Sequence, residues 1–245
     1  RVAPVREQAE DLQARGVEIP DVFAAIEEIR RAVDTGRLAE AHRLLFSKRV
    51  RTLPNLISWA EQGFLQKKQT MIRNHHFAVN CGSAEFVQTP SGTLFFPDRA
   101  YSPDTYGFVG PRRAASHPVA GIRGTDTPRL FRTESYQLQG YRFSVPDGKY
   151  TVRLYHKIGY KPAARPGGYV LTVSAESRTL LDRVDVYEAC GEDARRVFVR
   201  TFENIPVDDG SLDVSFAASP AGNCNAIEVF PTGEGPAGGQ AAHSQ

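Results

Sequence analysis

The sequence predicts a mainly β protein, in which a β-sandwich follows a small antiparallel α-helical region. Residues 1–73 place their apolar side chains at helical spacing, whereas from about residue 77 onward apolar and polar side chains alternate with period two. Turn sequences rich in Pro, Gly and Asp separate the alternating runs, and short strands with regular turns are typical of a sandwich. We therefore expect a helical connector or docking region over 1–75, a sandwich over 76–232, and a disordered tail or linker over 233–245.

The helical region divides into amphipathic segments joined by short links. "PDVFAAIEEIRRAVDTG" forms one apolar stripe that Gly36 ends, "RLAEAHRLLFSKR" forms another, and "VREQAEDLQARG" is a weaker first helix. Pro54 is expected to begin the last helix. Short links between such helices predict antiparallel packing. The region either packs its stripes internally or presents them to another domain of the same chain.

The sandwich region contains alternating runs with turn signals between them. The turn signals include Pro146-Asp147-Gly148, Pro166-Gly167-Gly168 and Asp208-Asp209-Gly210. The runs are "HFAVNCG", "TLFF", "YRFSV", "YTVRLYH", "YVLTVSAE", "RVFVRTF", "LDVSF" and "NAIEVF". Residues 97–130 show no such alternation, and an irregular stretch of this length predicts a functional or disordered loop.

Composition excludes several classes of function. A net charge of +2 argues against a nucleic-acid partner, and no apolar run reaches the roughly 20 residues of a membrane helix. Cys81, Cys190 and Cys224 form no CxxC pair, so three buried thiols are expected, with one disulfide, such as Cys190 to Cys224, as the alternative. The absence of an initiator Met and of a signal peptide is interpreted as the mark of an excised piece or of a processed product.

The chain lacks the motifs of catalytic and metal sites. GxSxG, HExxH, the P-loop and GxGxxG are all absent. The acids Asp208, Asp209 and Asp213 surround a glycine in the manner of a hairpin turn, so we expect no metal, no cofactor and no enzyme activity in this segment. A weaker alternative is a small hydrolase that uses Asp98 or Glu134 with Asp126.

Tyrosines beside polar residues suggest a binding surface. Tyr101, Tyr106, Tyr136 and Tyr160 fall in loops or at strand ends, where sandwich domains concentrate binding residues. A tyrosine ring can stack on the apolar face of a sugar, while nearby carboxylates and amides take its hydroxyls. The alternative for each tyrosine taken singly is packing in the core.

Six ordered segments resemble malectin and malectin-like carbohydrate-binding modules of the bacterial type. They are "FAVNCGSAEF", "FFPDRAYSPDTYGFVG", "GTDTPRLFRTESY", "YRFSVPDGKYTVRLYHKIGY", "LLDRVDVYEACG" and "GNCNAIEVFP", over about 77–231. The resemblance implies a jelly-roll type β-sandwich lectin that binds a glucan-like oligosaccharide or polysaccharide. It also implies export, as part of a larger protein such as a glycoside hydrolase.

The resemblance places candidate site residues by motif. Tyr106 occupies the tyrosine of the DYG loop, Tyr136 closes the T-E-R-Y segment, and Tyr160 is the tyrosine of the aromatic loop, followed here by Lys161. The acid expected before the closing strand is missing, and Asn223 lies in that segment. The candidate sugar-binding residues are Tyr106, Tyr136, Tyr160, Glu134, Asp98, Lys161 and Asn223. Tyr141 and Tyr150 are expected to be framework. Because one ring and one acid are lost, the alternative is a protein-interaction module with a degraded sugar site.

Overall fold

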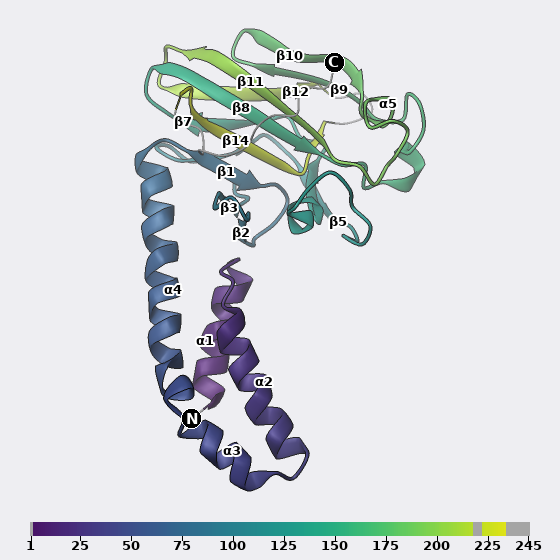
Figure 1. Cartoon of the computed structure of the whole chain (residues 1–245). Coiled ribbons are helices and arrows are strands. Elements are labelled where there is room, and N and C mark those ends of the chain that lie inside the picture. Colours follow the sequence, from purple (N-terminus) through teal and green to yellow (C-terminus); the bar gives the residue numbers. More distant parts are fainter. Residues whose placement is uncertain (1, 218–221, 234–245) are drawn as a thin grey trace. The chain divides into compact units, whose positions relative to one another are not determined.

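The structure is a computed structural model that describes residues 2–217 and 222–233 (Figure 1). The chain divides into two compact units, Arg1–Thr70 and Met71–Gln245. The predicted tail over 233–245 lies, apart from Gly233, outside the described residues.

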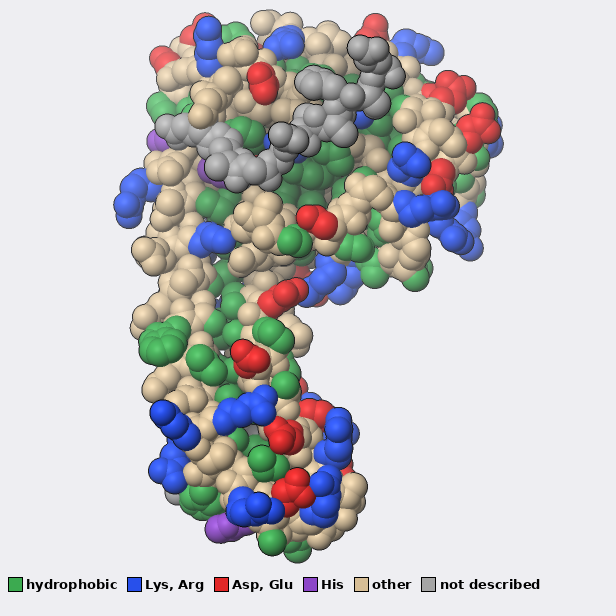
Figure 2. All heavy atoms as spheres, viewed as in Figure 1, with side chains coloured by type: hydrophobic (Ala, Val, Ile, Leu, Met, Phe, Trp, Pro, Cys, Tyr) green, Lys and Arg blue, Asp and Glu red, His purple; other side chains and the backbone are tan. Residues whose placement is uncertain are grey.

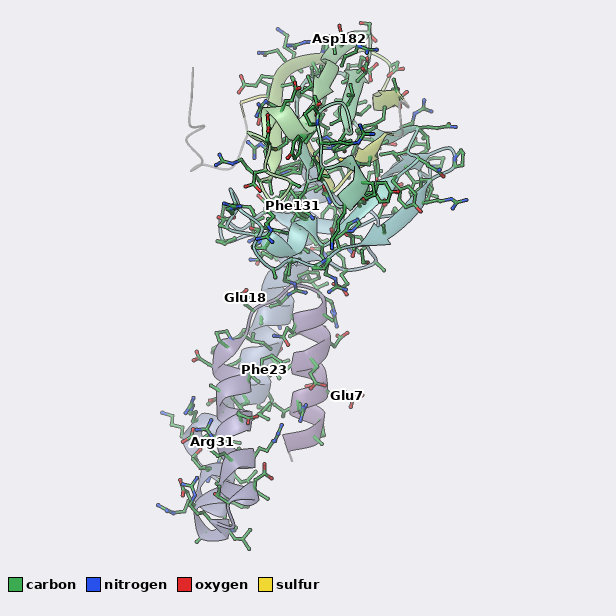
Figure 3. The ribbon with its side chains drawn as sticks, turned by 90° about the vertical axis from the view of Figure 1, so that its right-hand side faces the viewer. Glu7, Glu18, Phe23, Arg31, Phe131 and Asp182 are labelled. Carbon is green, nitrogen blue, oxygen red and sulfur yellow. The ribbon has the colours of Figure 1, made fainter. Side chains whose placement is uncertain are left out.

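The first unit consists of helices that pack through a narrow apolar stripe. Its elements are α1 (Val2–Ala14), α2 (Pro20–Asp34), α3 (Leu38–Leu45) and most of α4 (Lys48–Arg73). The buried stripe of α2 is Val22, Ala25, Ile26, Ile29 and Ala32. Val33, predicted to belong to that stripe, is 48% exposed. Ala25 and Ala32 are buried where the larger Val33 is not, so the buried apolar stripe of α2 is narrower than predicted. Charged side chains such as Glu7 and Arg31 point outward from α1 and α2 (Figure 3).

The position of Pro54 differs from the prediction. The sequence places it at the start of a helix, but α4 already begins at Lys48 and continues through Pro54. Proline lacks the N–H that would bond to the carbonyl four residues earlier, which disfavours it in a helix interior. Leu53 and Ile57, on either side of it, are 1% and 4% exposed, and we attribute the continuity of α4 to their burial.

Replacing Pro54 by alanine is expected to stabilise the helical unit. The change restores a helical N–H at an exposed position, and part of the gain is offset because proline also restricts the unfolded chain. We expect the free energy of unfolding to rise by about 1–2 kcal/mol. Chemical denaturation followed by helical circular dichroism measures this change. An unchanged or lowered midpoint would contradict this account of α4.

The second unit contains the predicted β-sandwich, with two larger sheets and one small sheet. The first has the order β11-β8-β14-β1-β3-β2, the second β10-β9-β12-β7-β4, and the small one β13-β6-β5. Neighbours pair antiparallel except β1 and β3, which are parallel. The strands are β1 (Phe77–Asn80), β2 (Val87–Gln88), β3 (Leu94–Pro97), β4 (Tyr106–Val109), β5 (Arg113–Ser116), β6 (Thr133–Tyr136), β7 (Gly140–Ser144), β8 (Gly148–His156), β9 (Val170–Ala175), β10 (Arg178–Asp185), β11 (Phe198–Val207), β12 (Ser211–Ala217), β13 (Asn223–Cys224) and β14 (Ala226–Pro231). Short helices are η1 (Pro128–Phe131), η2 (Lys161–Ala163) and α5 (Val186–Ala189).

The sandwich core follows the alternation in the sequence. Along β12, Leu212, Val214 and Phe216 are buried while the residues between them are more exposed. Tyr141 and Tyr150 are 0% and 3% exposed, which confirms that they are framework. Phe131 of η1, labelled in Figure 3, is also buried. Its ring contacts the Tyr155 ring.

The stretch 97–130 is more ordered than the sequence suggests. It contains β4, β5 and most of η1. The prediction of an irregular loop was wrong for β4 and β5 because strand pairing, not side-chain alternation, forms them. The residues of β5, "RAAS", have no apolar period, but each pairs with a residue of β6.

Each cysteine in the described part of the chain is buried and free. Cys81, Cys190 and Cys224 form no disulfide, so the considered Cys190–Cys224 bond is not present. The Cys190 thiol donates to the Arg196 carbonyl and the Cys224 thiol to the Ala226 carbonyl.

Charged side chains of both signs are interspersed on the visible surface of each unit (Figure 2). Among the helices of the described residues, none combines the length and apolar character that crossing a membrane requires.

Candidate functional site

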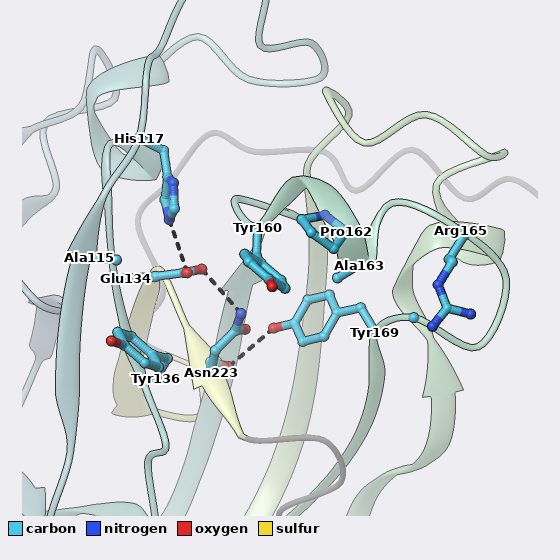
Figure 4. Close-up of a pocket in the computed structure, with 11 residues that line it drawn as sticks. Ala115, His117, Glu134, Tyr136, Tyr160, Pro162, Ala163, Arg165, Tyr169 and Asn223 are labelled. Carbon is cyan, nitrogen blue, oxygen red and sulfur yellow. Dashed lines mark hydrogen bonds and ion pairs between the residues drawn. The ribbon is translucent and has the colours of Figure 1, made fainter.

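A pocket of about 550 Å³ opens beside the small sheet (Figure 4). Its residues come from β5, β6, β13 and the two loops that follow β5 and β8. The described lining residues are Ala115, His117, Glu134, Tyr136, Tyr160, Pro162, Ala163, Arg165, Gly168, Tyr169 and Asn223.

Strand β6 supplies the floor because it lies between β5 and β13. Glu134 and Tyr136 are two residues apart, so both point to one face of the strand. On β5, Ala115 pairs with Glu134, and its small side chain leaves room above the carboxylate. On β13, Asn223 pairs with Tyr136. Register alone therefore brings the acid, the tyrosine and the amide together.

The Glu134 carboxylate is held from both sides. His117 Nε2 lies 3.0 Å from Oε1, and Asn223 Nδ2 donates to Oε2 at 3.1 Å (Figure 4). The Glu134 side chain is 5% exposed and that of His117 16%. A buried carboxylate requires such donors because burial without them is costly. Glu134 is thus a fixed acceptor.

Tyrosines form the walls of the pocket. Tyr160 is 66% exposed, and Tyr136 is half-buried. Tyr169 is 4% exposed and donates its hydroxyl to the Asn223 carbonyl at 3.4 Å. The exposed Tyr160 ring is free to meet a ligand, whereas Tyr169 supports the strand that carries Asn223.

Cationic groups balance the single acid among the described lining residues. Arg165 belongs to the loop after β8, and no acid in the described part of the chain forms an ion pair with it. Lys157 is mostly buried next to the site; burial lowers the pKa of its ammonium, and the negative charge of Glu134 opposes that shift. The pocket therefore carries no excess of negative charge.

Four of the predicted site residues meet in this pocket. They are Glu134, Tyr136, Tyr160 and Asn223. The other three predicted residues, Tyr106, Asp98 and Lys161, do not line this pocket.

Tyr106 is a core residue. It is 8% exposed, its hydroxyl donates to the Pro97 carbonyl at 2.9 Å, and its ring packs against Phe77 and Phe96. Burial raises the pKa of its phenol. Tyr106 is the first residue of β4 and pairs with the core residue Phe143 on β7, so its ring points into the core. The loop-like sequence around Tyr106 did not indicate this orientation.

Asp98 binds the side of β6 that faces away from the pocket. Its Oδ2 accepts hydrogen bonds from the Gly82 amide at 2.6 Å, the Ser135 hydroxyl at 2.7 Å and the Tyr141 hydroxyl at 3.0 Å. Ser135 faces away from the pocket because it lies between Glu134 and Tyr136 on β6. Asp98 thus fixes the strand and does not meet a ligand in the pocket.

Lys161 begins η2 with an exposed side chain outside the pocket. Asp126, considered with Asp98 or Glu134 for a hydrolase, accepts a hydrogen bond from Thr127 and is not a lining residue.

The sequence did not identify His117, Arg165 or Tyr169 as site residues. His117 lies in the stretch interpreted as irregular, and Tyr169 opens an alternating run typical of framework. Arg165 precedes a Pro-Gly-Gly turn, which carries no functional signal. The described residues contain no group of three or more His, Cys, Asp or Glu that could hold a metal ion.

Comparisons with known proteins show the family and the fold. Curated proteins give no match. Among solved structures, a β-glucuronidase of Bacteroides uniformis is similar at 22% identity and TM-score 0.56, over 65% of this chain and 18% of that chain. The ANXUR1 extracellular domain of Arabidopsis thaliana is similar at 19% identity and TM-score 0.51, over 63% of this chain and 41% of that chain. The plant receptor-like kinase FER is similar at 19% identity and TM-score 0.51, over 64% of this chain and 42% of that chain.

The matched region thus spans less than half the length of each of these solved chains. The family model for the malectin domain matches residues 75–237, which include the sandwich and the pocket. Because this match covers well over half of the sequence, the chain belongs to the malectin domain family, whose members are carbohydrate-binding domains.

Proposed function

We propose that this chain is a non-catalytic carbohydrate-binding module whose pocket recognises a glucan-like oligosaccharide. The observation that carries the proposal is the exposed Tyr160 ring in the same pocket as the fixed acceptor Glu134. A sugar offers an apolar face to a ring and hydroxyls to polar groups at its edge, and both kinds of partner are present. The pocket volume falls in the range of about 300–1,000 Å³ typical of small-molecule sites.

Binding of a single oligosaccharide is expected to be weak. The pocket is open at Tyr160, and sugar hydroxyls must exchange well-held water for protein partners. Affinity on the order of micromolar to millimolar follows. A glycan array on the intact chain, followed by calorimetry with its strongest neutral ligand, tests the proposal.

Replacing Tyr160 by alanine is expected to weaken sugar binding by about 1–3 kcal/mol, as the loss of a stacking ring and a hydroxyl contact would. The melting temperature should stay nearly constant because the side chain is 66% exposed. Calorimetry and thermal melts on the same variant measure both quantities.

Lys161→Ala is the matched control, since this neighbour is exposed but does not line the pocket. It should bind as the unaltered chain does. If Tyr160→Ala bound every array ligand normally, the stacking role of Tyr160 would be wrong.

A second candidate is a protein-interaction module on the same fold. The observation that favours it is that Tyr106 is buried and Lys161 replaces an aromatic residue, which leaves few exposed rings. If the folded chain bound no glycan on the array, this candidate would be favoured over the first.

The proposed context is a larger, exported glycoside-hydrolase-associated protein, in which the helices connect the module to another domain. The support is the Bacteroides uniformis β-glucuronidase, in which the similar region is 18% of the chain. An antibody against residues 76–232 should then detect a product much larger than this chain in the source organism. Detection of only a product of this length would contradict the proposed context.

A further inference from the structure

The imidazole of His117 lies directly on Gly159, which is outside the set of lining residues. A Cβ at position 159 would overlap Nε2 and Cδ2 of the ring and lie 2.8 Å from Cε1. Gly159 does not have a positive φ, so its backbone conformation is open to other residues. The glycine is therefore needed for space, and the space is filled by His117.

Glu134 fixes the tautomer of His117. An ionised carboxylate can only accept hydrogen bonds, so at the 3.0 Å contact Nε2 must be the donor. In the neutral ring the other nitrogen, Nδ1, is then an acceptor. The ring atoms nearest Gly159 are Nε2, Cδ2 and Cε1, which puts Nδ1 on the far edge of the ring. No residue in the described part of the chain donates a hydrogen bond to Nδ1.

We propose that His117 is a specificity-determining residue of the pocket, whose Nδ1 accepts the hydrogen of a sugar hydroxyl. Glu134 and Gly159 both position the imidazole, Glu134 by its hydrogen bond and Gly159 by the absence of a side chain, and Glu134 keeps its own role as an acceptor in the pocket. This inference rests on the proposed function, since it names a contact, between His117 Nδ1 and a hydroxyl, through which the pocket recognises the sugar.

The contact selects a class of ligand. A lone pair on Nδ1, in a ring whose other nitrogen donates to the Glu134 carboxylate, attracts a hydroxyl hydrogen and repels an anionic group. The pocket should therefore prefer a neutral oligosaccharide to one that carries a carboxylate at the same position.

The tautomer can be measured without any ligand. Long-range proton–nitrogen spectra of the imidazole should show the proton of His117 on Nε2 in the unaltered chain. In Glu134→Gln, the amide oxygen still accepts from Asn223, so the amide nitrogen faces His117 and the ring proton moves to Nδ1. Sugar binding should then fall although Gln has nearly the shape of Glu.

The steric part is tested by a single methyl group. Gly159→Ala displaces the imidazole and changes no lining residue, while Gly148→Ala, whose Cβ would meet its nearest neighbour at 3.6 Å, is the matched control. With cellotetraose and maltotetraose as probes, Gly159→Ala and His117→Ala should each weaken binding by about tenfold. The double variant should be no weaker than either single variant, because both remove one contact. Gly148→Ala should bind as the unaltered chain does.

The outcomes separate the two proposals. Normal sugar binding by the unaltered chain with an Nδ1 proton on His117 would overturn this inference alone, as would unchanged binding by a folded His117→Ala variant. The inference would also be overturned if the double variant lost affinity by the product of the two single losses, since Gly159→Ala and His117→Ala would then act independently. If the unaltered chain bound neither oligosaccharide nor any array glycan, the proposed function would fail, and the sugar contact with it.

Discussion

Replacing Glu228 by glutamine is expected to lower the free energy of unfolding by about 3 kcal/mol, because it removes the charge at the centre of a buried cluster. Glu228 on β14 is 0% exposed. His76 Nε2 lies 2.8 Å from Oε1, while the Arg153 guanidinium and the Tyr155 hydroxyl donate to Oε2 at 3.1 and 2.8 Å. We expect the lower end of the range for broken buried pairs, since the Arg153 side chain is 29% exposed and keeps some water.

The effect of Glu228 should depend on pH in a defined direction. Burial by itself would raise the pKa of this carboxyl, but the His76 hydrogen bond, the charges of Arg153 and His76, and the Tyr155 hydroxyl together lower it below 4.5. The folded state therefore holds the carboxylate more strongly than the unfolded state does. Its contribution is present above about pH 4.5 and is lost as the pH falls through the lower folded-state pKa.

Denaturation of Glu228→Gln and the unaltered chain at pH 7 and at pH 3 measures both parts. The difference between the two proteins should be large at pH 7 and smaller at pH 3. Glu203→Gln, an exposed carboxylate on β11, is the control and should change stability by less than about 0.5 kcal/mol. Equal effects of the two substitutions would show that the cluster does not stabilise the fold.

His156 is expected to cost the protein about 3 kcal/mol of stability between pH 7 and pH 4. Its ring is 0% exposed, contacts the rings of Tyr169, Phe198 and Phe216, and has Nδ1 3.2 Å from the Tyr169 hydroxyl. Burial lowers the pKa of this imidazole from 6.5 to about 4, although Asn223 partly opposes the shift. The unfolded chain therefore takes up a proton below pH 6.5 that the folded chain does not, and stability falls as the pH falls.

His156→Gln isolates this effect, because glutamine keeps a polar group beside Tyr169 but does not titrate. The variant should be less stable at pH 7, since it loses ring contacts, yet its stability should decline less between pH 6.5 and pH 4. Unfolding by denaturant at several pH values gives the two slopes, and His42→Gln on the exposed surface of α3 serves as the control. Parallel curves for His156→Gln and the unaltered chain would rule out a buried, neutral His156.

Periodicity in the sequence was sufficient to predict the classes of structure. Helical spacing in "PDVFAAIEEIRRAVD" and period two in "LDVSF" each reflect one buried face, and burial of a face is a local pattern. The same rule explains why Glu134 and Tyr136 line one pocket, because residues two apart on a strand share a face. Pro54 and the stretch 97–130 escaped prediction because packing around Leu53 and Ile57, and pairing of β5 with β6, act over longer distances.

The candidate site divides in the same way. Motif order selected Tyr160 and Asn223, which lie in the loop after β8 and on β13 and line the pocket. Tyr106 and Asp98 occur in equally loop-like sequence, but the register of β4 with β7 turned the ring inward, and the donors Gly82, Ser135 and Tyr141 enclosed the carboxylate. His117 could not be selected at all, since its role depends on Glu134 in β6 and on the space that Gly159 leaves for its ring. The sequence by itself determined the strands that alternate with period two and the tyrosines that follow them; the tertiary structure alone decided which side chains share the pocket, because that depends on contacts between segments far apart in the chain.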